Sequence, residues 1–271
     1  MSSRSSARTV VEINLPKPGL IGVIHLSALP GSPRHDQSTE SIVQQALQDA
    51  EALENAGFDA VIIENFGDVP FPADALEPGA VAALAIVTAR VKRAISLPVG
   101  VNALRNDARS AMGIAAAADA DFIRVNVHTG LTAADQGWIE GRAAQTLRYR
   151  RQLGTDTAIF ADVHVKHAVP VSQPDIALAA EEVAYRGLAD ALIVTGPATG
   201  RGTDLDDLRR VKEAVPDRPV LAGSGATIET IRPILDTCDG VIVGTHIKRQ
   251  ARTGSPVDPK KAAAFVRAAR G

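Results

Sequence analysis

The sequence predicts a single (β/α)8 barrel, and three observations carry that prediction. Short apolar runs alternate with alanine-rich segments of helical period from Leu20 to the C-terminus. There are eight such runs, which is the strand number of this barrel. The length of 271 residues also suits one domain of this kind, which typically uses about 250 residues. An open doubly wound sheet is the alternative, because periodicity alone does not show that a sheet closes.

The eight apolar runs are rich in Val, Ile, Leu and Ala, as expected of parallel strands that helices cover. They are Leu20–Leu26, Phe58–Glu64, Pro98–Ala103, Asp121–Val127, Ala158–His164, Ala191–Thr195, Pro219–Ala222 and Gly240–Gly244. Helix signals fall between them. Thr39 with Ser41 can begin the first helix, Gly57 can end it, and Asp258 followed by Pro259 marks the start of the last.

Composition and charge exclude several classes of protein. The chain has 29 Lys plus Arg, spread along its length, and a net charge of −2, so no nucleic-acid partner is expected. No apolar run approaches the roughly 20 residues needed to span a bilayer, so no membrane insertion is expected. The single cysteine, Cys238, precludes an internal disulfide, and we expect a cytoplasmic protein. We divide the chain into a disordered tail (1–16) and a barrel domain (17–271), and expect a homo-oligomer.

Two glycine turns at the end of the chain predict a phosphate site. Gly223, Ser224 and Gly225 follow the seventh run and are expected to open a helix at Thr227, and Gly244 ends the eighth run. Glycines let the backbone approach an anion, and barrel enzymes frequently hold phosphate on the loops after the last two strands. Tight structural turns are the alternative interpretation. Lys248 either adds a positive charge or is a surface lysine.

The fifth run carries the densest chemistry. Because strand side chains alternate, Asp162, His164 and Lys166 share one face, and the valines between them share the other. The polar face is therefore expected to look into the barrel, where these residues act as acid, base and nucleophile. A buried ion-pair network is the alternative. His167 points the other way.

Further polar residues cluster at the predicted strand ends. We expect Glu64, Asn126 and His128 to assist catalysis, and the substrate-binding set to comprise His25, Asn65, Asn102 and Arg124. Each residue alone is more often a cap or a satisfied core group. Their shared position at strand ends favours a site.

Taken in order, these motifs resemble the BtpA/SgcQ family. The resemblance rests on Gly22–His25, Leu29–Pro33, Glu64–Phe66, Ala161–His167, Thr195–Gly196, Thr199–Gly200, Gly223–Ala226, Gly244–Thr245 and Pro256–Asp258. It implies a TIM barrel of the ribulose-phosphate-binding type that binds phosphate. It adds Thr195 to the expected substrate contacts, and Gly196, Gly200 and Thr245 to the expected phosphate contacts.

The favoured function is an enzyme that acts on a phosphorylated sugar or nucleoside-like compound by lyase, aldolase or isomerase chemistry. Lys166 would be a Schiff-base nucleophile or an electrostatic clamp. No cofactor is firmly implied, although Glu64, Asp162 and His164 form a less favoured set for a divalent metal. A non-catalytic assembly factor, of the kind linked to photosystem I biogenesis, is a second hypothesis. An FMN-dependent barrel is a third, and the aromatic content of 3% argues against it.

Overall fold

The computed structural model describes residues 11, 15–196 and 203–271, which form one closed barrel of parallel strands. Around the barrel the order is β1, β2, β3, β4, β7, β9, β10 and β11, and β11 pairs with β1 to close it. The strands are β1 (Gly19–His25), β2 (Ala60–Glu64), β3 (Val99–Asn102), β4 (Phe122–Val125), β7 (Ala158–Val163), β9 (Ala191–Val194), β10 (Val220–Ala222) and β11 (Gly240–Val243). All eight predicted runs are confirmed as strands, and the predicted barrel class is confirmed.

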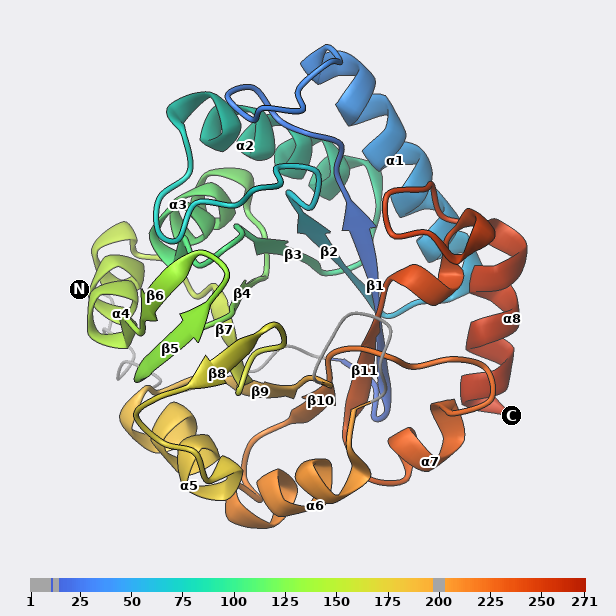
Figure 1. Cartoon of the computed structure of the whole chain (residues 1–271). Helices are drawn as coiled ribbons and strands as arrows, with labels where there is room; N and C mark the ends of the chain where they lie inside the picture. Colours follow the sequence, from blue (N-terminus) through green and yellow to red (C-terminus); the bar gives the residue numbers. More distant parts are fainter. Residues whose placement is uncertain (1–10, 12–14, 197–202) are drawn as a thin grey trace, which may run out of the picture.

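The helices form a ring around the strands (Figure 1). They are α1 (Thr39–Ala56), α2 (Pro78–Ala94), α3 (Ala108–Ala118), α4 (Ala143–Leu153), α5 (Ile176–Glu181), α6 (Leu205–Ala214), α7 (Ile231–Leu235) and α8 (Pro259–Arg270), with short turns η1 (Glu182–Arg186), η2 (Thr245–Ile247) and η3 (Arg249–Ala251). The predicted first and last helices are confirmed. Ser38 caps α1 and left-handed Gly57 ends it, while Asp258 caps α8 ahead of Pro259.

The interior of the barrel has an apolar floor. Inward side chains from all but one of the barrel strands form this layer, which contains Ile21, Val23, Ala60, Ile62, Phe122, Ala158, Phe160, Ala191, Ile193, Leu221 and Ile242. The rings of Phe122 and Phe160 stack with centroids 4.6 Å apart, and Phe122 fills the space beside Gly100 of β3. The outward faces pack against the helices as a separate, larger core. Among the described residues, the polar side chains that the barrel strands turn inward lie at the carboxyl ends of the strands, above this floor.

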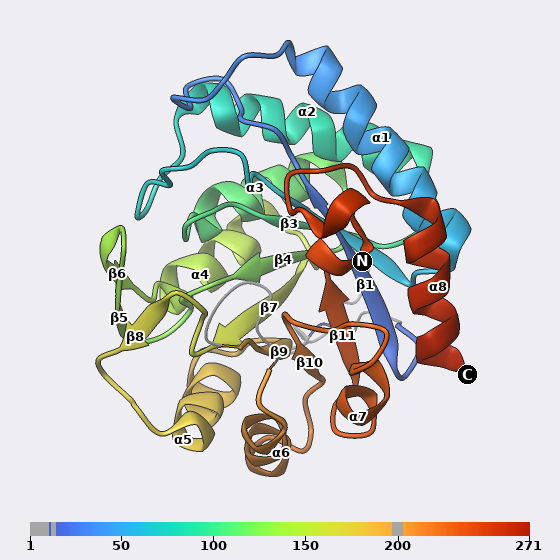
Figure 2. The same ribbon diagram turned by 45° about the vertical axis from the view of Figure 1, so that its right-hand side comes forward.

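A small antiparallel sheet, which the sequence does not predict by strand alternation alone, lies beside α4 and α5 (Figures 1 and 2). It consists of β5 (Leu131–Ala134), β6 (Gly137–Glu140) and β8 (Ala168–Pro170). The hairpin β5–β6 turns through Asp135 and Gln136, and Gly137 takes a left-handed φ of 96°. A glycine between two short apolar stretches is the signal that predicts such a hairpin.

Part of the predicted tail contacts the barrel. Val11 and Leu15 pack against the apolar floor, and the amide of Val11 donates to Asp190 at 2.6 Å. Residues 1–10 and 12–14, which make up the rest of that tail before Leu15, lie outside the described residues. Within the described ranges no helix combines the length and hydropathy needed to cross a membrane.

Candidate functional site

A layer of polar side chains lies directly above the apolar floor. It occupies the inward positions at the carboxyl ends of β1, β2, β3, β4 and β7, where the side chains are His25, Glu64, Asn102, Arg124 and Asp162. Arg124 lies at its centre, buried in the barrel. Its Nε and Nη2 atoms donate to the two carboxylate oxygens of Asp162 at 3.1 Å, and its Nη1 donates to Glu64 at 3.1 Å. Asn126 donates to the same Asp162 carboxylate at 2.8 Å. One arginine thus fixes two carboxylates.

His25 completes this layer beside Glu64. The imidazole Nε2 lies 3.7 Å from Glu64 Oε2, and Nδ1 is buried without a hydrogen-bond partner in the described part of the chain. Burial, reinforced by the nearby positive charges of Lys248, Lys166 and Arg124, holds the pKa of His25 well below its ordinary value. The imidazole is therefore a weak base, and its ring nitrogens are suited to donating or accepting a hydrogen bond.

Lys166 projects into the same space from the loop after β7. Its backbone is held on both sides, because its amide donates to Thr195 Oγ1 at 2.9 Å and its carbonyl accepts from Arg105 Nη2 at 2.7 Å. Burial is the main cause that lowers the pKa of Lys166, and the charge of Arg124 adds to it. A buried lysine with a lowered pKa is more readily deprotonated and hence more nucleophilic.

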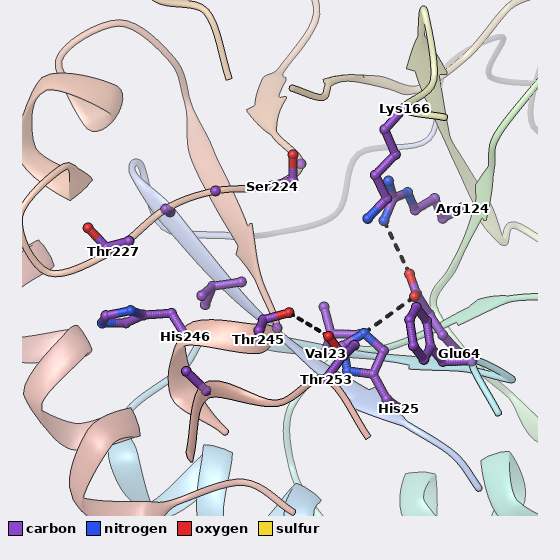
Figure 3. A pocket seen from close by; sticks show the side chains of 17 residues that line it. Val23, His25, Glu64, Arg124, Lys166, Ser224, Thr227, Thr245, His246 and Thr253 are labelled. Carbon is purple, nitrogen blue, oxygen red and sulfur yellow. Dashed lines mark hydrogen bonds and ion pairs between the residues drawn. The ribbon is translucent and has the colours of Figure 1, made fainter. Parts of the chain in front are cut away.

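These residues line a cavity of about 210 Å³, which we call the glycine cavity (Figure 3). His25, Glu64, Arg124 and Lys166 line it, together with the chain segments 223–227 and 243–246, Ala251 and Thr253. Figure 3 shows Lys166 and Arg124 pointing to the same part of the cavity, next to Glu64. The two predicted glycine turns therefore line the same cavity as His25, Glu64 and Arg124 of the polar layer.

The segment after β10 lines the glycine cavity and contains backbone donors without an acceptor in the described part of the chain. The amides of Ser224, Gly225 and Ala226 have no acceptor in the described part of the chain, whereas Gly223 donates to Val194 and Thr227 to Thr230. Gly225 has a φ of 74°, a conformation that side chains with a β-carbon rarely adopt. Successive amides that turn through a left-handed residue form a concave anion-binding site.

Gly244, in the second glycine turn, leaves room for the imidazole of His25. A β-carbon at Gly244 would lie 2.6 Å from His25 Cε1, so a larger residue would displace the imidazole. Thr245 and Thr253 add hydroxyls that bond to one another at 3.0 Å. The helix expected at Thr227 is wrong: a turn intervenes and α7 begins at Ile231, because Thr227 pairs with Thr230 instead. The amides at the predicted phosphate site therefore belong to a loop rather than to a helix end.

A second, larger cavity of about 580 Å³ adjoins the glycine cavity, and we call it the mouth cavity. The two share Glu64, Phe66, Arg124 and Lys166, which stand at the junction between them. The mouth cavity is further lined by Val69, Pro70, Phe71, Leu104, Arg105, Asn126, Asp135, Gln136 and His167. The shared residues make the two spaces the two ends of one cleft.

The prediction that Asp162, His164 and Lys166 share one cavity is wrong. β7 ends at Val163, and His164 takes a left-handed φ of 54°, which breaks the strand alternation. His164 instead shares a small side cavity of about 40 Å³ with Asp162, and its Nε2 lies 2.8 Å from the Gln173 carbonyl oxygen. Asp162 is closed by Arg124 and Asn126. The metal set of Glu64, Asp162 and His164 is therefore not assembled, and the described residues contain no cluster of three such ligands.

Three more of the predicted contacts lie away from the cleft. His128 is buried with Nε2 2.8 Å from the Gly187 carbonyl oxygen, and burial lowers its pKa to about 4. Asn65 holds the loop after β2 through Asp68 and Leu104. Lys248 points into the helix layer, where its ammonium pairs with Asp49 at 3.1 Å. None of these three residues lines either end of the cleft.

The remaining predicted contacts are indirect or undescribed. Asn102 contacts Asn126 at 3.4 Å beneath the cavity floor, and Thr195 acts on the Lys166 backbone. The Gly196 amide donates to Ser224 Oγ at 3.0 Å, which links Gly196 to the loop after β10. Gly200 lies outside the described residues. The sequence patterns do not predict Arg105, Phe71 and Gln136 as cleft residues, because they come from loops and from the β5–β6 hairpin.

Comparisons with known proteins agree with this architecture. The family model described as "BtpA family" matches residues 16–271. The chain is 44% identical over 249 residues to "Photosystem I biogenesis protein BtpA" of a Synechocystis strain, covering 92% of this chain and 87% of that protein. It is 47% identical over 251 residues to an uncharacterized protein of Thermococcus kodakarensis, covering 93% and 95%.

Solved structures share the fold at low sequence identity. One described as "Native KDPGal structure" superposes with a TM-score of 0.58 at 19% identity, covering 96% of this chain and 97% of that chain. N-acetylmannosamine-6-phosphate 2-epimerase from Clostridium perfringens superposes with a TM-score of 0.53 at 16% identity, covering 90% and 93%. These likenesses concern the barrel fold, whereas the match to the family model spans nearly the whole sequence. The chain therefore belongs to the BtpA family.

Proposed function

We propose that this protein is an enzyme that binds a phosphorylated sugar or nucleoside-like compound and rearranges it by lyase, aldolase or isomerase chemistry. One observation carries the proposal: a single cleft has, at one end, backbone amides without an acceptor in the described part of the chain and, in its middle, a half-buried lysine of lowered pKa. A phosphate anchored at the first would place the rest of the substrate beside the second.

The phosphate would bind the amides of Ser224, Gly225 and Ala226. Loop amides supply several directed donors without requiring an opposite charge, and barrels of this class frequently bind phosphate after the last two strands. Thr245 and Thr253 add hydroxyl donors on the facing wall. Lys166 and Arg124 make that end of the cleft favourable for a dianion.

The chemistry would take place between Lys166, Glu64 and His25. In its neutral form the Lys166 amine can attack a substrate carbonyl carbon and release water as a Schiff base forms, or it can act directly as a base. The Glu64 carboxylate can move a proton at the same carbon, and the adjoining His25 imidazole can hydrogen-bond to the substrate. Asp162 would act only by positioning Arg124, whose fixed charge stabilises developing negative charge.

The solved structures support the same direction. The name of the Clostridium perfringens enzyme describes an epimerase of a sugar phosphate. A barrel of the same fold can thus hold such a substrate. Because identity is low, the argument for this chain depends on its own amides and its own lysine.

Calorimetric titration with inorganic phosphate and ribose 5-phosphate tests the proposal. Gly225→Ala should weaken both affinities by roughly tenfold or more, because displaced amides lose hydrogen bonds to a charged group. Gly154→Ala is the matched control, since Gly154 also has a left-handed φ (67°) and has open space around it, remote from the cleft. Equal affinities in the two variants, or no binding by the parent protein, would contradict the proposed anion site.

A further inference from the structure

We infer that the mouth cavity holds a planar heteroaromatic ring, so that the substrate is nucleotide-like, with a phosphate and a ring at opposite ends of a pentose-sized linker. This inference rests on the proposed function and specifies its substrate class. It comes from the composition of the mouth cavity, which differs from that of the glycine cavity. Apolar and aromatic side chains form one part of its lining, which we call the apolar wall, and polar and charged side chains form another, which we call the polar wall.

The apolar wall is formed by the loop after β2 and by Leu104. Phe66 and Phe71 lie edge to face, with ring centroids 6.4 Å apart and planes 62° apart, and Val69 and Pro70 connect them in the sequence. Phe66 is fixed from behind by His25, whose ring centroid is 4.8 Å away. Rings held at such angles favour further aromatic contacts by stacking or by edge-to-face packing.

The polar wall combines groups that recognise the edges of a ring. Arg105 is buried, lines the mouth cavity and donates through Nη2 to the Lys166 carbonyl oxygen at 2.7 Å. Guanidinium planes stack on aromatic rings as well as donating hydrogen bonds. Gln136 comes from the tip of the β5–β6 hairpin, and its side-chain oxygen has no partner in the described part of the chain. A ring N–H donor would satisfy that oxygen after a small rotation of the amide.

A plain phosphosugar or an acyl chain fits these two walls less well. The phosphosugar would leave Phe66, Phe71 and Leu104 facing hydroxyl groups, while the acyl chain would strip water from Arg105 and Asp135 without replacing its hydrogen bonds. A heteroaromatic ring has apolar faces and a polar edge, so it suits both walls. The glycine cavity is connected to the mouth cavity through Glu64 and Lys166, which would place the linker between ring and phosphate beside the reactive groups.

The test compares the affinities of AMP, UMP and ribose 5-phosphate by calorimetry on the intact protein. At least one nucleotide should bind roughly tenfold more tightly than ribose 5-phosphate, which is the usual gain from stacking one base on aromatic side chains. Phe71→Ala should remove most of that gain and leave ribose 5-phosphate affinity unchanged, whereas Phe71→Tyr should retain it. Ile86→Ala, on the exposed side of α2, is the control for truncating an apolar residue.

The outcomes separate this inference from the proposed function. If ribose 5-phosphate binds and neither nucleotide binds more tightly, the ring site is wrong while the anion site stands. If a nucleotide binds more tightly but Phe71→Ala leaves the difference intact, the ring does not occupy the mouth cavity and the inference fails. If no compound binds, the proposed function fails and the inference fails with it.

Discussion

The carboxyl end of β7 and the glycine turns after β10 and β11 form two walls of the same barrel, yet they are built differently. The β7 wall is made of charged side chains that pair with one another, with Asp162 closed by Arg124 and Asn126. The glycine wall presents backbone amides that pair with nothing in the described part of the chain. The polar groups of the first wall are paired within the fold, whereas the amides of the second are left for water or a ligand.

Buried charged side chains and loop amides differ in whether they are left available to bind a ligand. A charged residue inside a barrel must be neutralised, so it often finds its partner within the fold, as Asp162 does. A loop amide that faces an open cavity carries only a small cost, because water can satisfy it until an anion arrives. The β7 wall should therefore respond to mutation through stability, and the glycine wall through ligand binding.

Asp162→Asn gives the largest expected effect on stability. The substitution removes a buried negative charge that neutralises Arg124, so the free energy of unfolding should fall by about 3–5 kcal/mol. Chemical denaturation measures it. Asp74→Asn is the matched control, because Asp74 pairs with Arg142 on the surface, where an ion pair contributes at most about 1 kcal/mol. A loss for Asp162→Asn no larger than that for Asp74→Asn would show that the β7 wall is not held together by this pair.

Comparison of the parent protein with Lys166→Met should reveal the lowered pKa of Lys166 in the pH dependence of the free energy of unfolding. The unfolded chain binds a proton at this site up to about pH 10.4, whereas the folded chain releases it at a lower pH. Between these two pKa values the unfolded state binds more protons, so the stability of the parent protein, relative to Lys166→Met, should rise as pH rises. Below the folded pKa the difference is constant. A flat difference throughout the alkaline range would mean that Lys166 is solvated rather than buried.

His164→Asn should have the smallest effect. Asn tolerates the left-handed backbone at this position, and the loss of one hydrogen bond to the Gln173 carbonyl costs about 0.5–1.5 kcal/mol. Binding of ribose 5-phosphate should not change, since His164 lies in the side cavity. A loss of ligand-dependent thermal stabilisation in this variant would return His164 to the cleft and contradict the observed break after β7.

The sequence predicts much of this structure because strand alternation is local. The eight strands follow from it, as do the inward positions of Glu64, Arg124 and Asp162, since a barrel strand with one face on the helices must turn its other face inward. Alternation no longer predicts side-chain direction beyond the end of a strand, and the sequence does not always mark that end. His164 has a left-handed φ, and no glycine or proline at that position indicates it in the sequence. The sequence therefore does not show that the alternation ends before Lys166.

Contacts between residues distant in the sequence could not be predicted, because strand and helix patterns are local. Lys248 is paired with Asp49, which lies on α1 at the other end of the chain, and the β5–β6 hairpin reaches the mouth cavity only through tertiary packing. The glycine turns could be predicted because their requirement is carried by the backbone and does not depend on side-chain direction. The homo-oligomer and the cytoplasmic location stay predictions.

The most direct test of the central claim is a crystal structure of the protein with ribose 5-phosphate bound. We predict difference density for the phosphate group within about 3 Å of the amides of Ser224, Gly225 and Ala226, with the sugar extending toward Lys166. Phosphate density at any other place, with those three amides facing only water at saturating ligand, would contradict the account.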